Sequence, residues 1–296
     1  MKFFKIASLL IALLLISAGC SLADEIKSEA TKEVKQQSKK AIDEIKNGIS
    51  GDKTPAIENS KEDKDLINSS TNDENYAYIN DNKADLTSDN RSEIKKKGNS
   101  DFWVNYSDLD KYGRGGKVTA LVTSESVNSH SSKSQERPSF DYNVHVAGEY
   151  KDGQYDPIKQ TWKGENSNNK ILQLDGYRGY IYNKSHSLAW SLGGDMETHN
   201  LTLGTRAQNV GSNKASEGGG MGYPETQVRE AIYSKPETKV FYEVVPVYNN
   251  DELVPRGSHV KAYSINDNGK TVNLNVWIAN KQKGVNINYK DGTYKQ

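Results

Sequence analysis

The sequence predicts an α+β domain with a mixed antiparallel sheet over residues 99–296. Two observations support this fold class. Short runs of β-branched and aromatic residues occur both before and after a single helical pattern, as expected when strands surround one helix. Residues 48–98, in contrast, contain almost no large apolar side chains, so they contribute little to a hydrophobic core.

The expected strands are short and bounded by polar residues. Alternating apolar runs lie at 118–122, 142–146, 240–248, 260–265, 272–278 and 285–289. The last two runs are separated by Ala-Asn-Lys-Gln-Lys-Gly, which is typical of a hairpin connection. An aromatic run at 177–182 is a further strand-like segment.

One helix is predicted at 225–233, and Pro224 stands at its entrance. Val228, Ala231 and Ile232 fall on one face of this helix and would pack against the sheet. The strands and the helix together span about 195 residues, which is enough for one sizeable core.

The amino-terminal segment indicates export. Residues 1–19 combine Lys2 and Lys5 with an apolar run at 6–16, as in a signal peptide that is too short to span a membrane. Cys20, the single cysteine of the chain, follows small residues and is predicted to accept a lipid anchor at the outer face of a bacterial membrane. The alternative is free secretion after cleavage behind the small residue Ala23.

Residues 20–98 are predicted to form a disordered, partly helical tether. Apolar residues in 24–47 have loosely helical spacing, which favours a marginal solvated helix. Residues 48–98 are rich in Asn, Asp, Ser and Lys and cannot bury enough surface to offset chain entropy. Such a tether would hold a domain away from a membrane or through a cell wall.

The charge balance excludes a strongly basic domain. The net charge of the chain is zero, and residues 101–296 hold 23 Lys and Arg against 22 Asp and Glu. Any nucleic acid would therefore be bound by a local groove rather than by the overall charge of the domain.

The most informative stretch is 183–209, which places His186 after the aromatic run and ends at Asn209. A lone imidazole with a neutral amide ligand suits hydrolysis of a phosphodiester by water, assisted by one divalent cation. Taken alone, His186 also fits a hydrogen-bonded surface or core histidine, and Asn209 fits a turn or cap residue. The surrounding residues are therefore needed to distinguish a catalytic site from these structural roles.

Five blocks, found in a specific order, resemble the DNA/RNA non-specific endonuclease family of the ββα-metal (His-Me finger) class, and most of all the secreted streptococcal-type DNases. They are LDKYGRGG at 109–116, NKSHSLAWSLGG at 183–194, NLTLGTRAQNVGSN at 200–213, GGGMGYPETQVRE at 218–230 and LVPRGSHVKAYSIN at 253–266. The resemblance covers residues 101–296 and implies a ββα-metal catalytic core within the α+β fold.

The resemblance implies a catalytic role for His186 and a metal-binding role for Asn209. The strict family signature is Asp-Arg-Gly-His, and this chain reads Asn183-Lys184-Ser185-His186, so only the histidine matches it. His186 would be the general base that takes a proton from water. Asn209 would hold Mg²⁺, with Mn²⁺ as the other candidate ion. Asn200 is the second candidate for the metal ligand.

The same resemblance extends to four charged residues. Glu225 and Arg229 share one face of the predicted helix, where the acid would orient water at the metal and the arginine would contact phosphate. The alternative is that Glu225 and Arg229 form an ordinary ion pair on the helix surface. Arg206 and Arg178 are expected to neutralise substrate phosphates, although Arg206 also fits a structural partner of a buried carboxylate.

The sequence as a whole predicts an exported, Mg²⁺-dependent endonuclease that cuts DNA, with RNA as a second substrate. The alternative is a catalytically inactive nucleic-acid-binding lipoprotein at the cell surface, favoured by the departures at Asn183 and Lys184. A third interpretation is an adhesin or solute-binding lipoprotein unrelated to nucleic acid. The sequence leaves the oligomeric state open.

Overall fold

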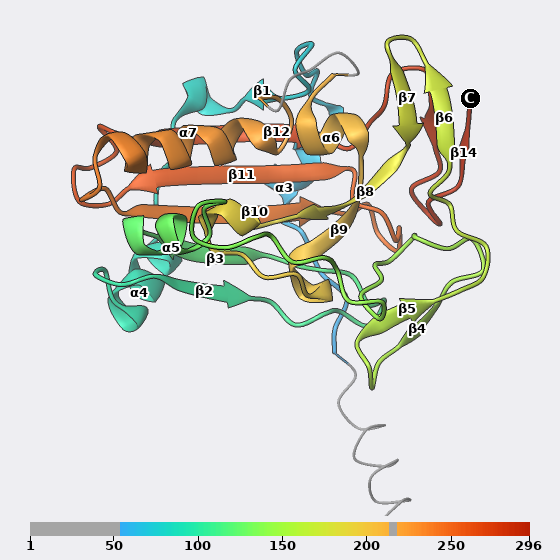
Figure 1. Ribbon diagram of the computed structural model, residues 1–296, viewed down its shortest axis with the longest axis horizontal. Helices are drawn as coiled ribbons and strands as arrows, with labels where there is room; N and C mark the ends of the chain where they lie inside the picture. The colour runs from blue at the N-terminus through green and yellow to red at the C-terminus, as the bar shows by residue number, and fades with distance from the viewer. Residues whose placement is uncertain (1–53, 213–217) are drawn as a thin grey trace, which may run out of the picture. The chain divides into compact units, whose positions relative to one another are not determined.

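A computed structural model describes residues 54–212 and 218–296, which belong to one compact unit, Thr54–Gln296 (Figure 1). The predicted signal peptide, Cys20 and the helical pattern at 24–47 lie outside the described residues. Among the residues that the structure describes, no helix is long and apolar enough to cross a membrane.

The unit is built on a six-stranded antiparallel sheet. Its strands follow the order β1 (Ala77–Tyr78), β12 (Asn273–Ala279), β11 (Gly257–Ser264), β10 (Val240–Val247), β3 (Val118–Val122) and β2 (Trp103–Tyr106). Four predicted runs, at 118–122, 240–248, 260–265 and 272–278, are therefore confirmed as strands. The mixture of this sheet with helices confirms the α+β fold class.

One face of the sheet packs against the helices α7 (Gly222–Ser234) and α5 (Ser124–Ser129) (Figure 1). Alternate residues of the strands point into this core, including Tyr242 and Val276, which are fully buried. Val228 and Ile232 supply the apolar side of α7, as predicted. The helix begins three residues before the predicted position, at Gly222.

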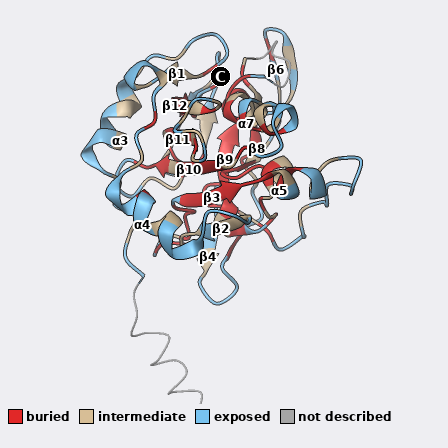
Figure 2. Cartoon of the chain, turned by 90° about the vertical axis from the view of Figure 1, so that its left-hand side faces the viewer, coloured by how far each residue is buried: buried red, intermediate tan, exposed pale blue. Residues whose placement is uncertain are grey.

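The opposite face of the same sheet is also buried, and residues before position 99 cover it. Figure 2 shows α3 (Lys61–Asp65) and α4 (Ser88–Lys97) on one side of the buried strands and α7 on the other. Trp277 is completely buried there against Leu66, Ile67 and Ile79. Two short 3-10 turns, η1 (Leu66–Asn68) and η2 (Asn80–Asn82), complete this covering segment.

The prediction of a disordered tether is therefore wrong for residues 54–98. The segment buries few apolar side chains, but asparagines attach it to the sheet. Asn59 donates to the carbonyl of Pro246 at 2.9 Å and accepts from the amide of Tyr248 at 2.9 Å. Asn90 donates to the Glu243 carboxylate at 2.9 Å. Composition alone misses such a segment, because its order comes from groups on the sheet rather than from its own core.

The remaining strands form small two-stranded sheets beside the main sheet. They are β4 (Gln154–Asp156) with β5 (Thr161–Lys163), β6 (Ile171–Leu174) with β7 (Tyr177–Tyr180), β8 (Tyr182–His186) with β9 (Leu201–Thr205), and β13 (Asn286–Ile287) with β14 (Tyr294–Lys295). Two 3-10 turns, η3 (Trp190–Leu192) and η4 (Thr198–Asn200), and the helix α6 (Arg206–Val210) lie among them.

Two strand predictions are wrong in this region. Residues 142–146 form no strand; Val144 and Val146 instead enter a second core with Ile181 and Leu203. The expected hairpin between 272–278 and 285–289 is also absent, because β12 pairs with β11 and β13 pairs with β14. Alternation shows which side chains are buried, and it cannot show whether a strand partner or a packed loop buries them.

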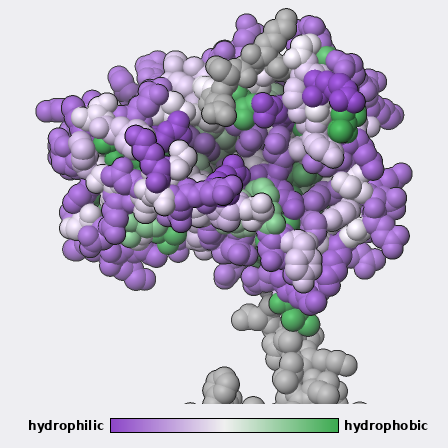
Figure 3. Space-filling view, viewed as in Figure 1, coloured by the Kyte–Doolittle hydropathy of each residue, from purple (hydrophilic) through white to green (hydrophobic). Residues whose placement is uncertain are grey.

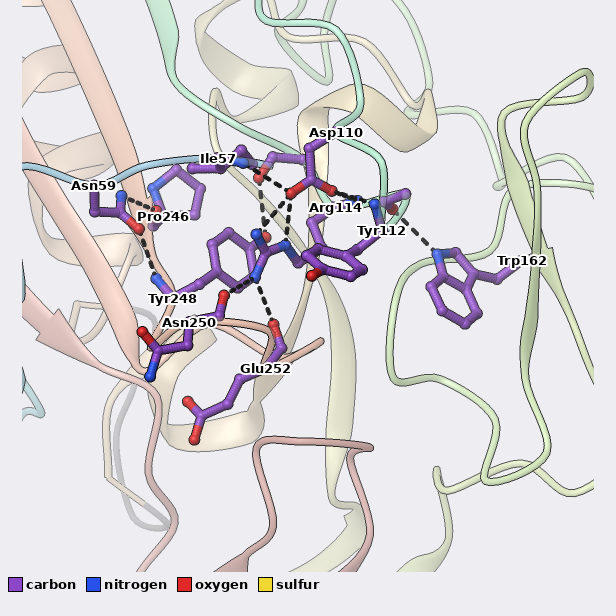
Figure 4. A network of polar contacts seen from close by, with 12 residues as sticks. Ile57, Asn59, Asp110, Tyr112, Arg114, Trp162, Pro246, Tyr248, Asn250 and Glu252 are labelled. Carbon is purple, nitrogen blue, oxygen red and sulfur yellow. Dashed lines mark hydrogen bonds and ion pairs between the residues drawn. The ribbon is translucent and has the colours of Figure 1, made fainter. Parts of the chain in front are cut away.

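A buried ion pair joins the covering segment to the rest of the unit (Figure 4). The Arg114 guanidinium, which is 0% exposed, contacts the Asp110 carboxylate at 2.7 Å and donates to the carbonyls of Asn250 and Glu252 at 2.8 Å each. Asp110 also accepts a hydrogen bond from the amide of Ile57 at 3.0 Å. The Asp110–Arg114 pair thus connects three distant parts of the chain, at residues 57, 110–114 and 250–252.

A fragment that begins at residue 99 should be much less stable than one that begins at residue 54. Removing residues 54–98 exposes the buried Trp277 and deletes the hydrogen bonds that Glu243 and Asp110 accept from Asn90 and Ile57. Thermal unfolding and binding of a hydrophobic dye would compare the two fragments. Equal melting temperatures and equal dye binding would show that the segment is dispensable.

Replacing Arg114 with Met should destabilise the unit by about 3–5 kcal/mol, because Asp110 would keep a buried charge without its partner. The double variant with Asp110→Asn should recover part of that loss. Urea unfolding of the two variants measures both effects. If Arg114→Met costs no more than an exposed substitution such as Lys295→Met, the ion pair does not contribute to stability as argued.

Candidate functional site

The predicted site is organised on a β-β-α unit made of β8, β9 and α6 (Figure 1). His186 is the last residue of β8 and pairs with Leu201 of β9, so it lies in a strand and not on the turn expected from its polar neighbours. Helix α6 begins directly after β9, where the Thr205 hydroxyl accepts a hydrogen bond from the amide of Gln208 at 2.9 Å. This cap turns the chain back toward β8.

The turn brings Asn209 to the strand that carries His186. The Ser185 hydroxyl donates a hydrogen bond to Asn209 Oδ1 at 3.1 Å. Asn209 is half-buried, and its side-chain oxygen keeps a second lone pair. Ser185 and Asn209, which lie 24 positions apart in the sequence, are therefore neighbours.

His186 lies in an apolar pocket and is 8% exposed. Phe140 stacks beside the imidazole with ring centroids 5.6 Å apart, and Nε2 lies 3.2 Å from Met196 Sδ. Burial, with a smaller contribution from the positive charge of Arg137, lowers the pKa of His186 to about 4. The imidazole is therefore neutral at neutral pH and able to accept a proton.

Asn200, the second candidate for the metal ligand, has a structural role. It is fully buried, and its Oδ1 accepts from the amide of Leu188 at 2.9 Å. Its amide nitrogen donates to the carbonyls of Leu188 at 3.0 Å and Asp195 at 2.9 Å. Because these bonds hold the loop between β8 and β9 together, Asn200 is no longer a candidate ligand.

Helix α7 carries Glu225 and Arg229 one turn apart. Burial raises the pKa of Glu225 to about 8, and the positive charges of Arg229 and Arg137 act against that shift. Arg229 donates to the hydroxyls of Ser191 and Thr226 at 3.3 Å each. The two residues therefore differ from a solvated surface pair, because the acid sits in a low-dielectric environment and the arginine is held by hydroxyl groups.

Arg137 is a component that the sequence did not reveal. It belongs to an exposed loop, yet its charge lowers the pKa of both His186 and Glu225. Its guanidinium also lies 5.9 Å from the ring centroid of Phe140. The loop has no apolar periodicity and no motif, so only the tertiary structure shows that one cation lies near both titratable groups.

The other two predicted arginines lie on the side of the β6–β7 hairpin. Arg206, the first residue of α6, lies 5.7 Å from the ring centroid of Tyr177 and is half-buried. Arg178 is exposed on β7, opposite Gln173.

The donor set fits one hydrated divalent cation rather than a closed metal cage. Within residues 54–212 and 218–296, no group of three or more His, Cys, Asp or Glu side chains could hold a metal ion. The Asn209 amide oxygen, with its free lone pair, suits an ion such as Mg²⁺ that keeps several waters.

Comparison with known proteins identifies the class of this domain. Residues 157–266 match the model of the DNA/RNA non-specific endonuclease family. This range contains β8, β9, α6 and α7, and with them each of the site residues predicted from the sequence apart from Cys20. Residues 157–266 therefore resemble a DNA/RNA non-specific endonuclease domain.

Particular relatives are streptococcal. A deoxyribonuclease from Streptococcus dysgalactiae subsp. equisimilis is 32% identical over 202 residues, which is 64% of this chain and 59% of that protein. The structure of Sda1 nuclease with bound zinc aligns with a TM-score of 0.61 and 26% identity over 75% of this chain and 97% of that one. Magnesium-bound NucA from Streptococcus agalactiae aligns with a TM-score of 0.52 and 21% identity over 76% of this chain and 88% of that one, which shows the same fold.

Replacing Glu225 with Gln should stabilise the protein at pH 8 more than at pH 5. The folded-state pKa of about 8 lies above the ordinary 4.5, so stability from the protonated acid is present below pH 4.5 and is lost as pH rises through 8. The gain should be on the order of 2 kcal/mol greater at pH 8. Urea unfolding in EDTA at both pH values measures this gain. If Glu225→Gln changes the free energy of unfolding equally at pH 5 and pH 8, Glu225 is not buried as argued.

Proposed function

We propose that this protein is a metal-dependent endonuclease that hydrolyses phosphodiester bonds of DNA, with RNA as a second substrate. The observation that carries the proposal is the placement of a neutral imidazole, His186, on the strand residue next to the Ser185–Asn209 contact. This arrangement joins a proton acceptor and an amide that suits a hydrated cation within one β-β-α unit. The family match and the 32% identical deoxyribonuclease support the same reaction class.

His186 acts as the general base. Its depressed pKa keeps the imidazole unprotonated well below pH 7, so it can take the proton of the attacking water. Asn209 would hold the divalent cation, which would supply stabilisation of negative charge on the phosphate. Zinc in Sda1 nuclease and magnesium in NucA support a divalent ion, and Mg²⁺ is our proposal, with Mn²⁺ as the alternative.

The cationic side chains hold the phosphate. Arg229 is positioned by its hydroxyl partners, and Arg137 lies between the base and Glu225. Glu225 becomes ionised when positive charge is added near it, and it then orients the attacking water. Arg206 and Arg178 contact phosphates further along the strand.

Contacts of this kind go to phosphates and carry little sequence information. The surface agrees with local rather than global charge attraction. Figure 3 shows a largely hydrophilic face with small separate hydrophobic areas, and the net charge of the chain is zero. We therefore propose cutting with little sequence preference.

Lys184 explains how the chain tolerates its departure from the family signature. Its Nζ donates to the carbonyl of Val144, lies 3.6 Å from the Glu149 carboxylate and 5.4 Å from the ring centroid of Phe140. It thus supports the pocket wall that lies against His186. This structural role favours the active enzyme over the inactive nucleic-acid-binding alternative.

Export and lipid attachment at Cys20 are proposed from the amino-terminal sequence. Lys2 and Lys5 before the apolar run direct the chain to export, and the cysteine follows small residues. An exported nuclease would act on extracellular nucleic acid. Mass spectrometry of the mature amino terminus would distinguish a lipidated Cys20 from a free terminus at Asp24.

His186→Ala and Asn209→Ala in a fragment of residues 54–296 should each lower plasmid cleavage in Mg²⁺ by about 100-fold or more. Parent activity should require the metal and persist below pH 6, because the pKa of His186 is about 4. Agarose-gel assays with plasmid and RNA, in Mg²⁺, Mn²⁺ or EDTA, measure this.

Imidazole added to His186→Gly is the control for the role of the base. Partial recovery of cleavage identifies a lost proton acceptor rather than a lost fold. A folded parent fragment that cuts nothing with any divalent metal would establish the binding-protein alternative. Cleavage that survives His186→Ala would place the base elsewhere.

A further inference from the structure

We propose that a pocket beside the candidate active site binds one unpaired nucleobase of the substrate, next to the phosphate that is cut. The inference rests on the proposed nuclease function and adds to it a mode of substrate recognition. The pocket has a volume of about 720 Å³, which falls in the range of small-ligand sites. It is lined by Asn128, His130, Lys133, Arg137, Trp190, Ser191, Arg229 and Tyr233, together with neighbouring polar residues.

Aromatic side chains from separate elements form the walls of this pocket. Trp190 of η3 meets His130, at the end of α5, edge to face, with ring centroids 4.5 Å apart and an interplanar angle of 72°. Tyr233 of α7 is 50% exposed. A base has a flat apolar face that stacks on such rings whatever its identity.

An unpartnered donor lies in the wall of the pocket. The indole nitrogen of Trp190 is buried and has no hydrogen-bond partner among the residues that the structure describes. A buried N–H without a partner is costly, and in this position a base or sugar oxygen could accept its hydrogen bond. The wall thus offers both a stacking surface and a polar contact.

Cations connect the pocket to the catalytic residues. Arg229 and Arg137 line it, and their charges also act on the carboxylate of Glu225. Arg137 acts on His186 as well. Lys133 adds a third positive charge at the rim. A phosphate held by the two arginines would lie between the general base and the pocket, so the attached nucleoside would be directed into it.

The spacing along α7 matches this order of contacts. Along α7, four-residue intervals separate Glu225, Arg229 and Tyr233. Each residue therefore lies about 6 Å further along the helix than the one before it and on nearly the same face. The helix therefore presents an acid, a phosphate contact and a base-stacking ring in succession. A bound nucleotide has its parts in the same order: the scissile bond, the rest of the phosphate, and then the base.

A base that is stacked within a duplex cannot enter such a pocket. Occupation of the pocket requires the nucleotide to be single-stranded, frayed or turned out of the helix, which costs unstacking energy in paired DNA. The pocket should therefore make binding tighter for single strands than for blunt duplexes of equal length. It should also show little preference among bases, because stacking dominates the contact.

Tyr233 offers a matched pair of variants, because its exposed ring can be replaced without opening the core. Tyr233→Phe keeps the stacking surface and Tyr233→Leu removes it. In EDTA, affinity for a short oligothymidylate should fall roughly 5- to 100-fold for Tyr233→Leu and stay near the parent for Tyr233→Phe. An abasic deoxyribose-phosphate chain of the same length should bind the parent more weakly and show no difference between the variants. Fluorescence anisotropy measures all of these affinities.

Equal losses for both variants, or equal binding of the abasic chain and oligothymidylate to the parent, would overturn the base pocket. The pocket would then hold phosphates only. The nuclease proposal is tested separately by metal-dependent cleavage. Cleavage without ring-dependent binding refutes the pocket alone, and ring-dependent binding without cleavage refutes the nuclease alone.

Discussion

Burial of both faces of the central sheet is the constraint on which the rest of this structure depends. The strands β10 and β12 are rich in apolar residues and buried at nearly every position, so neither face can be left in water. The helices α7 and α5 cover one face. Residues 54–98 cover the other, although the segment is polar and has few apolar side chains of its own. The candidate site residues of α7 are therefore supported by a sheet whose other face is shielded from water by the amino-terminal segment.

The same segment also touches the start of the helix that carries the site. Tyr76 stacks on Tyr223 with ring centroids 4.1 Å apart, and the carbonyl of Glu74 accepts from the amide of Gly220 at 2.7 Å. Both contacts are within five residues of Glu225. Stability of the covering segment and the position of the acid are thus coupled through the first turn of α7.

Electrostatics in the candidate site follow from burial more than from ion pairing. His186 loses its proton easily and Glu225 keeps its proton, and in both residues burial is the largest cause of the pKa shift. The charges of nearby arginines make smaller contributions to the two pKa values. Both titratable side chains are uncharged at neutral pH. A bound polyanion and a bound cation would each add charge to such a site.

Most strands of the central sheet and the helix α7 could be predicted from the sequence. The alternation in 240–248 and 272–278 reports buried strands, and the blocks around His186 and Asn209 carry a specific resemblance. The close approach of Asn209 to the strand of His186 follows from a strand, a Thr205 cap and a helix in succession, which are local features. The strand and helix predictions were confirmed because each depends on residues that are near one another along the chain.

Only the tertiary structure decided which polar segments are ordered and which charges meet. Residues 54–98 look like a tether because their partners, such as Pro246 and Glu243, are supplied by strands more than 150 residues away. Arg137 lies in a loop without any pattern, and its effect on the base exists only where that loop folds over the pocket. The sequence by itself determined the strands of the central sheet and the residues from which the catalytic proposal starts. The packing of distant segments, which depends on partners that no local pattern encodes, decided the boundary of the domain and the shape of its substrate pocket.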